Sequence, residues 1–213
     1  NPMIKNGKSL VINDDENENS EVIESNLITG SSEAYGIEFY VKKKTGAWTG
    51  WMSYTLSRSW KTINGEFDEE KISRGLKFPS NFDKPHDFTF VMDYKANPLV
   101  SYGANFTYST GRPTTAPQAI YDLGLLTSVY TYSLRNEERI PDYHRLDLSM
   151  TVKSKPRIDR RWRMSWTLAV YNLYGRKNAY SMYYTNEKGS PPSAYKLSVL
   201  GSAFPSLMVN FNF

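Results

Sequence analysis

Two histidines, each close to acidic residues, are the side chains of this chain best suited to chemistry. His86 lies between Asp83 and Asp87, and His144 lies in a similar acidic stretch. A structural zinc site needs about four nitrogen, sulfur or carboxylate ligands, and the 213 residues contain no cysteine and no third histidine. Ser–His–Asp catalysis is compatible with the residue types, but the sequence has no nucleophile-elbow motif. We therefore expect hydrogen-bond networks at strand ends here, and no enzyme activity.

Three further stretches have the composition of a binding site but lack its spacing. Residues 13–24 (NDDENENSEVIE) are acidic without the ligand spacing and glycine of an EF-hand. Residues 153–163 (KSKPRIDRRWR) are basic, but the net charge of +4 is modest and dispersed, so no nucleic-acid partner is expected. Residues 109–115 (STGRPTT) are too poor in glycine to cradle a phosphate. We expect solvated loops and turns, and no resident metal or cofactor.

The elements that must position any site are predicted by an alternation of apolar and polar residues. In residues 145–153 (RLDLSMTVK), Leu148 and Met150 fall on one side of an extended strand and Ser149 falls on the other. A period of two is typical of a strand with one apolar face. The same period recurs in residues 33–43, 51–59, 87–95, 100–110, 164–170 and 204–213. The sequence thus predicts seven strands in an all-β fold, with no long helix.

The connections between these strands alternate between short and long. The expected short turns are residues 44–47, 95–98 and 154–159, and the expected long loops are about 1–32, 63–82, 115–141 and 185–194. Short turns at one end and long loops at the other are typical of an antiparallel up-and-down transmembrane β-barrel. No run reaches the roughly 18 apolar residues of a membrane helix. A soluble β-sandwich or lipocalin-like barrel is the alternative, but its loops would be shorter.

Each face of the predicted strands has its own expected surroundings. Aromatic residues make up 15% of the chain, and many lie near strand ends, where membrane barrels carry aromatic girdles. The residues expected at the lipid or its interface are Trp48, Tyr94, Leu148, Met150, Trp166, Phe211 and Phe213. The residues expected to face the lumen, in contact with a plug or a substrate, are Glu38, Asp93, Arg145, Asp147 and Tyr171.

Several motifs, in their order and spacing, resemble the C-terminal part of a TonB-dependent outer-membrane transporter of the Bacteroidota type. Residues 35–59 (YGIEFYVKKKTGAWTGWMSYTLSRS) resemble the down-strand, turn and up-strand of that family. Residues 139–150 (RIPDYHRLDLSM) match its P-x-Y-H-R-[LV]-D pattern, and residues 169–184 (AVYNLYGRKNAYSMYY) match its penultimate strand. Further likeness lies in residues 78–90, 106–115 and 204–213.

The resemblance implies a fold, a place and a function. Residues 33–213 would be the last seven strands of a barrel of about 22 strands, and residues 1–32 an extracellular loop or the end of a preceding strand. The whole protein would be an active importer of an iron chelate, cobalamin, glycan or peptide in the bacterial outer membrane. Its partners would be lipid and lipopolysaccharide, the remaining strands and plug of the same protein, TonB through that plug, and a surface lipoprotein. The alternatives are a non-transporting adhesin or structural barrel, and an envelope enzyme.

Overall fold

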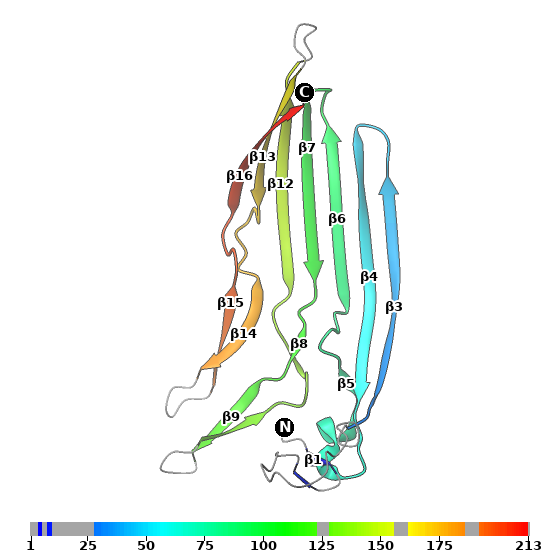
Figure 1. Ribbon diagram of the computed structural model, residues 1–213, viewed down its shortest axis with the longest axis vertical. Coiled ribbons are helices and arrows are strands. Elements are labelled where there is room, and N and C mark those ends of the chain that lie inside the picture. The colour runs from blue at the N-terminus through cyan, green and yellow to red at the C-terminus, as the bar shows by residue number, and fades with distance from the viewer. Residues whose placement is uncertain are drawn as a thin grey trace, which may run out of the picture. The chain divides into compact units, whose positions relative to one another are not determined.

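The fold is all-β and antiparallel. The computed structural model describes residues 4–5, 8–9, 28–122, 128–155, 162–185 and 192–212. All seven predicted strands pair in one sheet, side by side in chain order (Figure 1). They are β3 (Ser31–Lys43), β4 (Trp48–Thr62), β6 (His86–Lys95), β7 (Val100–Ser109), β12 (Tyr143–Lys153), β13 (Arg163–Tyr171) and β16 (Phe204–Asn212). The period-two pattern was therefore sufficient to locate the sheet.

Short and long connections alternate along this sheet, as the sequence predicts. β3 and β4 are joined by residues 44–47, β6 and β7 by 96–99, and β12 and β13 by 154–162. The other three connections are long and carry short elements of their own. These are the 3₁₀ turns η2 (Asp68–Glu70) and η3 (Ile72–Gly75), and the strands β5 (Phe78–Pro79), β8 (Pro113–Thr114), β9 (Pro117–Asp122), β10 (Ser128–Tyr132), β11 (Glu138–Arg139), β14 (Ala179–Thr185) and β15 (Ser193–Ser198). Near the N-terminus, β1 (Ile4–Lys5) pairs with β2 (Lys8–Ser9).

The extent of the last long loop was predicted wrongly. The sequence predicted a long loop at about residues 185–194, but the connection runs from 172 to 203 and contains the β14–β15 hairpin. Tyr183 of one strand stacks on Tyr195 of the other at 5.6 Å between ring centroids. Tyrosine at consecutive positions 183 and 184 hides the period of two, so this hairpin has no clean alternation to reveal it.

The chain divides into two compact units. One, which we term the loop unit, comprises residues 1–35, 58–83 and 113–139; the other, the sheet unit, comprises 36–57, 84–112 and 140–213. The long strands β3 and β4 run through both. No helix in the described residues is long and apolar enough to cross a membrane.

The register of the sheet separates an apolar face from a polar face. Leu148 lies opposite Ala104 on one side and Val170 on the other, and directly paired residues of antiparallel strands share a face. When the same pairing is followed across the neighbouring strands, the larger apolar side chains fall on one face of the sheet. They include Trp48, Met52, Phe90, Tyr94, Tyr102, Phe106, Leu148, Met150, Trp166, Leu168, Leu207 and Phe211.

Nothing in the described part of the chain covers this apolar face. Leu168 and Leu207 are 53% and 63% exposed. Phe78 of the loop unit is the one hydrophobic side chain buried among the described residues. A sheet face of this size in a soluble domain normally packs on a second layer. The apolar side chains of this sheet therefore still need an apolar environment.

Candidate ligand groove on the polar face

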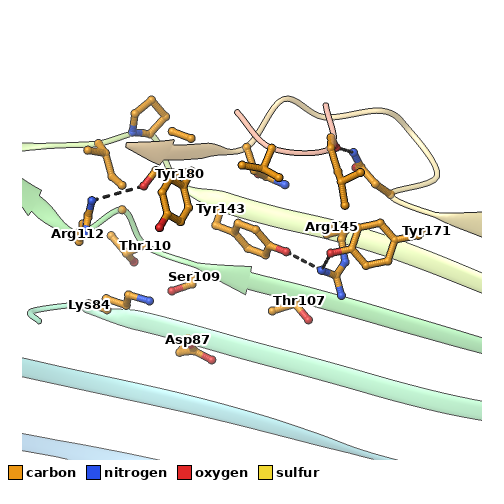
Figure 2. Close-up of a pocket in the computed structure, with 18 residues that line it drawn as sticks. Lys84, Asp87, Thr107, Ser109, Thr110, Arg112, Tyr143, Arg145, Tyr171 and Tyr180 are labelled. Atoms are coloured by element: carbon orange, nitrogen blue, oxygen red, sulfur yellow. Dashed lines mark hydrogen bonds between the residues drawn. The ribbon is translucent and has the colours of Figure 1, made fainter. Parts of the chain in front are cut away.

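A groove of about 520 Å³ lies on the polar face of the sheet unit, at the strand ends from which the long connections leave (Figure 2). That volume is in the range of small-molecule sites. Its polar and aromatic lining comprises Lys84, Asp87, Thr107, Ser109, Thr110, Arg112, Tyr143, Arg145, Tyr171, Asn172, Asn178 and Tyr180. Ile140, Pro141, Val199 and Leu200 add an apolar part.

Strand register brings the centre of the groove together. Ser109 of β7 pairs with Asp87 of β6 on one side and with Tyr143 of β12 on the other. Thr107, two residues back on β7, pairs in the same way with Arg145. Because residues two apart on a strand share a face, these five side chains form two adjacent rows across three strands.

Arg145 is the hub of the groove wall. Its guanidinium donates to the Asp147 carboxylate at 3.0 Å and to the Tyr143 hydroxyl at 2.8 Å, and it also donates to the Tyr171 hydroxyl. It lies over the Tyr171 ring, 3.9 Å from the centroid. The side chains of Arg145 and Asp147 are each 19% exposed, so their charges attract each other more strongly than in open water. The hub is therefore held in one orientation (Figure 2).

Asn172 joins this hub to the connection that follows β13. Its backbone N–H donates to Asp147 at 2.9 Å. Its side-chain amide donates to the carbonyls of Arg176 and Leu200, both at 3.1 Å, and its side-chain oxygen accepts the Arg176 N–H. Asn172 is 1% exposed and has a φ of 53°, a left-handed conformation that asparagine tolerates better than most residues.

A close backbone approach shapes the rim of the groove. Gly111 donates its N–H to Asp142 at 2.9 Å, and the Tyr108 hydroxyl donates to the same carboxylate at 2.7 Å. A side chain at Gly111 would place its Cβ only 1.7 Å from the Ile140 carbonyl oxygen. The glycine of the STGRPTT stretch therefore allows two segments to approach, and phosphate binding is not needed to explain it.

Several polar groups in the groove remain available to a ligand. The Ser109 hydroxyl is buried and has no hydrogen-bond partner in the described part of the chain. Lys84 and Asp87 form no ion pair among the described residues, and within them the Arg112 guanidinium contacts only the Tyr180 carbonyl, at 3.4 Å. A buried polar group without a partner is costly. The groove is thus suited to a ligand with both donors and acceptors.

Neither histidine takes part in the groove. His86 bonds the Tyr54 hydroxyl at 2.8 Å and His144 bonds the Tyr174 hydroxyl at 2.7 Å, both on the apolar side of the sheet. Partial burial raises the pKa of the Tyr174 phenol above its ordinary value. No group of three or more metal-ligating side chains occurs in the described residues. The expected strand-end hydrogen bonds are present, with tyrosines as the partners of the imidazole rings.

The residues expected to face the lumen are only partly brought together. Arg145, Asp147 and Tyr171 form the hub described above, and Asp93 lines a neighbouring hollow of about 300 Å³ that also includes Asp147 and Tyr171. Glu38 lies on the outermost strand β3, in the lining of neither hollow. That these residues meet a plug or a substrate stays a prediction.

The residues expected at lipid occupy the opposite face. Trp48 stacks on Tyr94 at 4.1 Å, and Trp166 pairs with Val209 in the row next to Phe211. Leu148 and Met150 are about 40% exposed in the middle of the same face. Phe213 lies outside the described residues. That this face meets lipid also stays a prediction.

Sequence reasoning missed several groove residues. Tyr143 shares the period of Arg145 and could have been found by extending the strand by one pair. Lys84, Arg112 and Asn172 lie in irregular segments, where a pattern in sequence gives no side-chain direction. Comparison with protein-family models, with curated proteins and with solved structures finds no match to this chain.

Proposed function

We propose that the chain forms seven neighbouring strands in the wall of a transmembrane β-barrel, in a TonB-dependent outer-membrane importer. The observation that carries the proposal is a sheet with one uncovered apolar face and one polar, hollowed face. Burying a Leu, Phe or Met side chain contributes about 1.5–3 kcal/mol, and this contribution is not realised in water. Lipid against the apolar face would realise it, while the polar face lines a wet interior.

Aromatic groups at both ends of the apolar face support this orientation. At the short-turn end, Trp48, Tyr94 and Tyr102 stack in sequence across three strands. At the loop end lie the hydrogen-bonded rings of the Tyr54–His86 and His144–Tyr174 pairs. Amphipathic rings favour the two interfaces of a bilayer, with apolar side chains between them.

The spacing of these ends fits a bilayer. From His144 to Val152, β12 advances by eight residues, which is about 26 Å at roughly 3.3 Å per residue. At a strand tilt near 40°, this corresponds to about 20 Å along the membrane normal, comparable with the roughly 25 Å apolar band of outer-membrane barrels.

The edges of the sheet support a larger barrel. β3 and β16 each have a strand on only one side in the described residues. Unpaired backbone groups cannot face lipid without a large penalty, so further strands would have to pair with both edges. Those strands and a plug would enclose the groove, which would then contact a nutrient entering from the loop side.

Matched substitutions on β12 test the membrane proposal. Arginine on the lipid face at mid-bilayer costs about 2–4 kcal/mol, while lumen positions tolerate it better. In the whole protein, Leu148→Arg should reduce the amount assembled in the outer membrane, and Ser149→Arg should not. Membrane fractionation and heat-modifiable gel mobility measure this. Equal assembly of both variants, or the reverse order, would refute the assigned faces.

A second experiment separates an importer from an adhesin. Thr107→Trp should fill the groove, whereas Thr89→Trp, on the same face and strand pair but outside the groove lining, should not. Profiling of spent medium should identify a solute that wild-type cells deplete in a TonB-dependent manner and that cells with Thr107→Trp leave behind. If Thr107→Trp cells deplete every solute as wild-type cells do, the groove has no role in import.

A further inference from the structure

The loop unit contains a cavity of its own, of about 600 Å³, and its lining has a distinct chemistry. It is lined by Ile72, Ser73, Arg74, Thr115, Tyr132, Ser133, Leu134 and Arg135. The charged members are two arginines, and no carboxylate is among the lining residues. The cavity is formed by three segments: η3, Thr115 just before β9, and the end of β10 with the residues that follow it.

The two arginines differ from the other arginines of the same unit. Arg58 and Arg139 both contact the carboxylate of Asp83, which is 1% exposed, and so fix the loop framework. Arg74 and Arg135 are exposed and have no acidic partner in the described residues. An arginine has five N–H donors in a planar fork that matches a carboxylate or phosphate. Both guanidinium groups therefore retain their capacity to bind an anion.

The backbone around the cavity is strained and firmly held. Ser73, Arg74 and Asn136 have φ values of 53°, 60° and 59°, a left-handed region that costs energy for residues other than glycine. The Arg135 N–H donates to the Ser73 hydroxyl at 3.1 Å, and the Asn136 N–H donates to the Thr115 hydroxyl at 3.0 Å. Strain that surrounding bonds maintain is typical of preorganised binding sites.

The asparagine side chain adds to this rigidity. Asn136 is 4% exposed, and its amide donates to the Pro79 carbonyl and to Asn81 Oδ1, both at 2.7 Å. These bonds connect the segment that carries Arg135 to the segment that follows Arg74. The two guanidinium groups therefore extend from a fixed frame, which lowers the entropy cost of binding.

The remaining polar groups of the cavity also favour an anion. The hydroxyls of Ser73 and Thr115 accept backbone N–H groups, so each keeps its own O–H proton available to donate. The Tyr132 hydroxyl is a further donor. We infer that this cavity is a binding site for an oxyanion, a phosphate or carboxylate group on a solute or a lipid headgroup. This inference does not depend on the transport proposal, because it concerns the loop unit alone.

Calorimetric titration of the purified whole protein tests the inference. The soluble probes are inorganic phosphate and sodium glucuronate, and the lipid-borne probe is lipid A in nanodiscs, with phosphatidylcholine nanodiscs as the blank. Wild-type protein should bind at least one probe, more weakly at 0.5 M than at 0.05 M salt because of charge screening. Binding of a soluble probe indicates a solute-borne anion, and binding of lipid A alone indicates a headgroup.

Matched variants make the test specific. Arg74→Gln and Arg135→Gln should each weaken binding about tenfold, the equivalent of one charged hydrogen bond. Arg74→Lys should weaken it less, because the charge remains. Lys44→Gln, which removes an exposed cation from the β3–β4 turn, should leave binding unchanged. Unaltered melting temperatures would show that the variants fold. No binding of any probe by the wild type, or equal losses in Lys44→Gln, would overturn the inference.

Discussion

Replacing Asn172 should release the connection between β13 and β16 without unfolding the sheet. Asn172→Ala removes the side-chain donor bonds to the carbonyls of Arg176 and Leu200 at 3.1 Å and of Ser202 at 3.4 Å, and the acceptor bond from the Arg176 N–H at 3.1 Å. Leaving these backbone groups buried without hydrogen-bond partners lowers the stability of the connection by about 2–4 kcal/mol in total. Alanine at a φ of 53° adds about 1 kcal/mol. Asn172→Gly should lose the bonds but not incur the conformational cost, so we expect it to be destabilised by about 1 kcal/mol less.

Hydrogen exchange on the whole protein in detergent measures this locally. Backbone amides in residues 172–185 and 192–203 should exchange at least about 100-fold faster in Asn172→Ala, corresponding to roughly 3 kcal/mol. Amides of β7 and β12 away from this junction should be unchanged. If the amides of Asn172→Ala exchange at the wild-type rate, the assigned role of the side chain is refuted. If Asn172→Gly exchanges at the wild-type rate while Asn172→Ala exchanges faster, only the backbone conformation matters and the side-chain hydrogen bonds contribute nothing.

Three further predictions concern other polar groups. Asp83→Ala leaves two arginines without their shared carboxylate and should destabilise the loop unit by about 3 kcal/mol. Chymotrypsin should therefore cleave the purified variant faster than the purified wild type, and equal resistance would contradict this. Arg145→Leu should lower the melting temperature, because it leaves the Asp147 carboxylate unpaired. The double variant Arg145→Leu/Asp147→Leu should recover part of that decrease. An equal decrease in melting temperature in both variants would argue against the ion pair. Because burial raises the pKa of Tyr174, its contribution to stability should be complete below about pH 10, the ordinary pKa of a tyrosine, and should be lost as pH rises through the higher folded-state pKa. The melting temperatures of wild type and Tyr174→Phe, measured at increasing pH, should therefore converge at alkaline pH. A constant difference between the two melting temperatures would contradict the raised pKa of Tyr174.

The sheet could be predicted from sequence because each of its strands obeys one local rule. In β12, every second residue is apolar from Leu146 to Val152, and pairing with β7 keeps the same set on one face. Register errors would move all of these side chains at once, so a clear alternation also determines which residues share a face. The alternation fails at Tyr183 and Tyr184, and there the prediction failed too.

The groove could be predicted only in part, for a different physical reason. Arg145, Asp147 and Tyr171 lie on regular strands, so their shared face followed from the period of two. Asn172 lies in a left-handed turn whose bonds reach residue 200, and no local pattern predicts a contact between residues so far apart. Side chains in irregular segments have no periodic direction, and their position depends on tertiary contacts.

Asp147, Leu148 and Ser149 are consecutive residues, yet each neighbour has the opposite environment. Asp147 bonds Arg145 in the groove, Leu148 lies on the uncovered apolar face, and Ser149 lies on the polar face opposite Gly103. In the proposed barrel wall this arrangement is required, because the two faces of one strand would meet different surroundings. The apolar face and the polar face are therefore products of one pattern: a shift of one residue would place Asp147 on the apolar face and Leu148 on the polar face. The proposed membrane insertion and the proposed ligand binding should then be lost together.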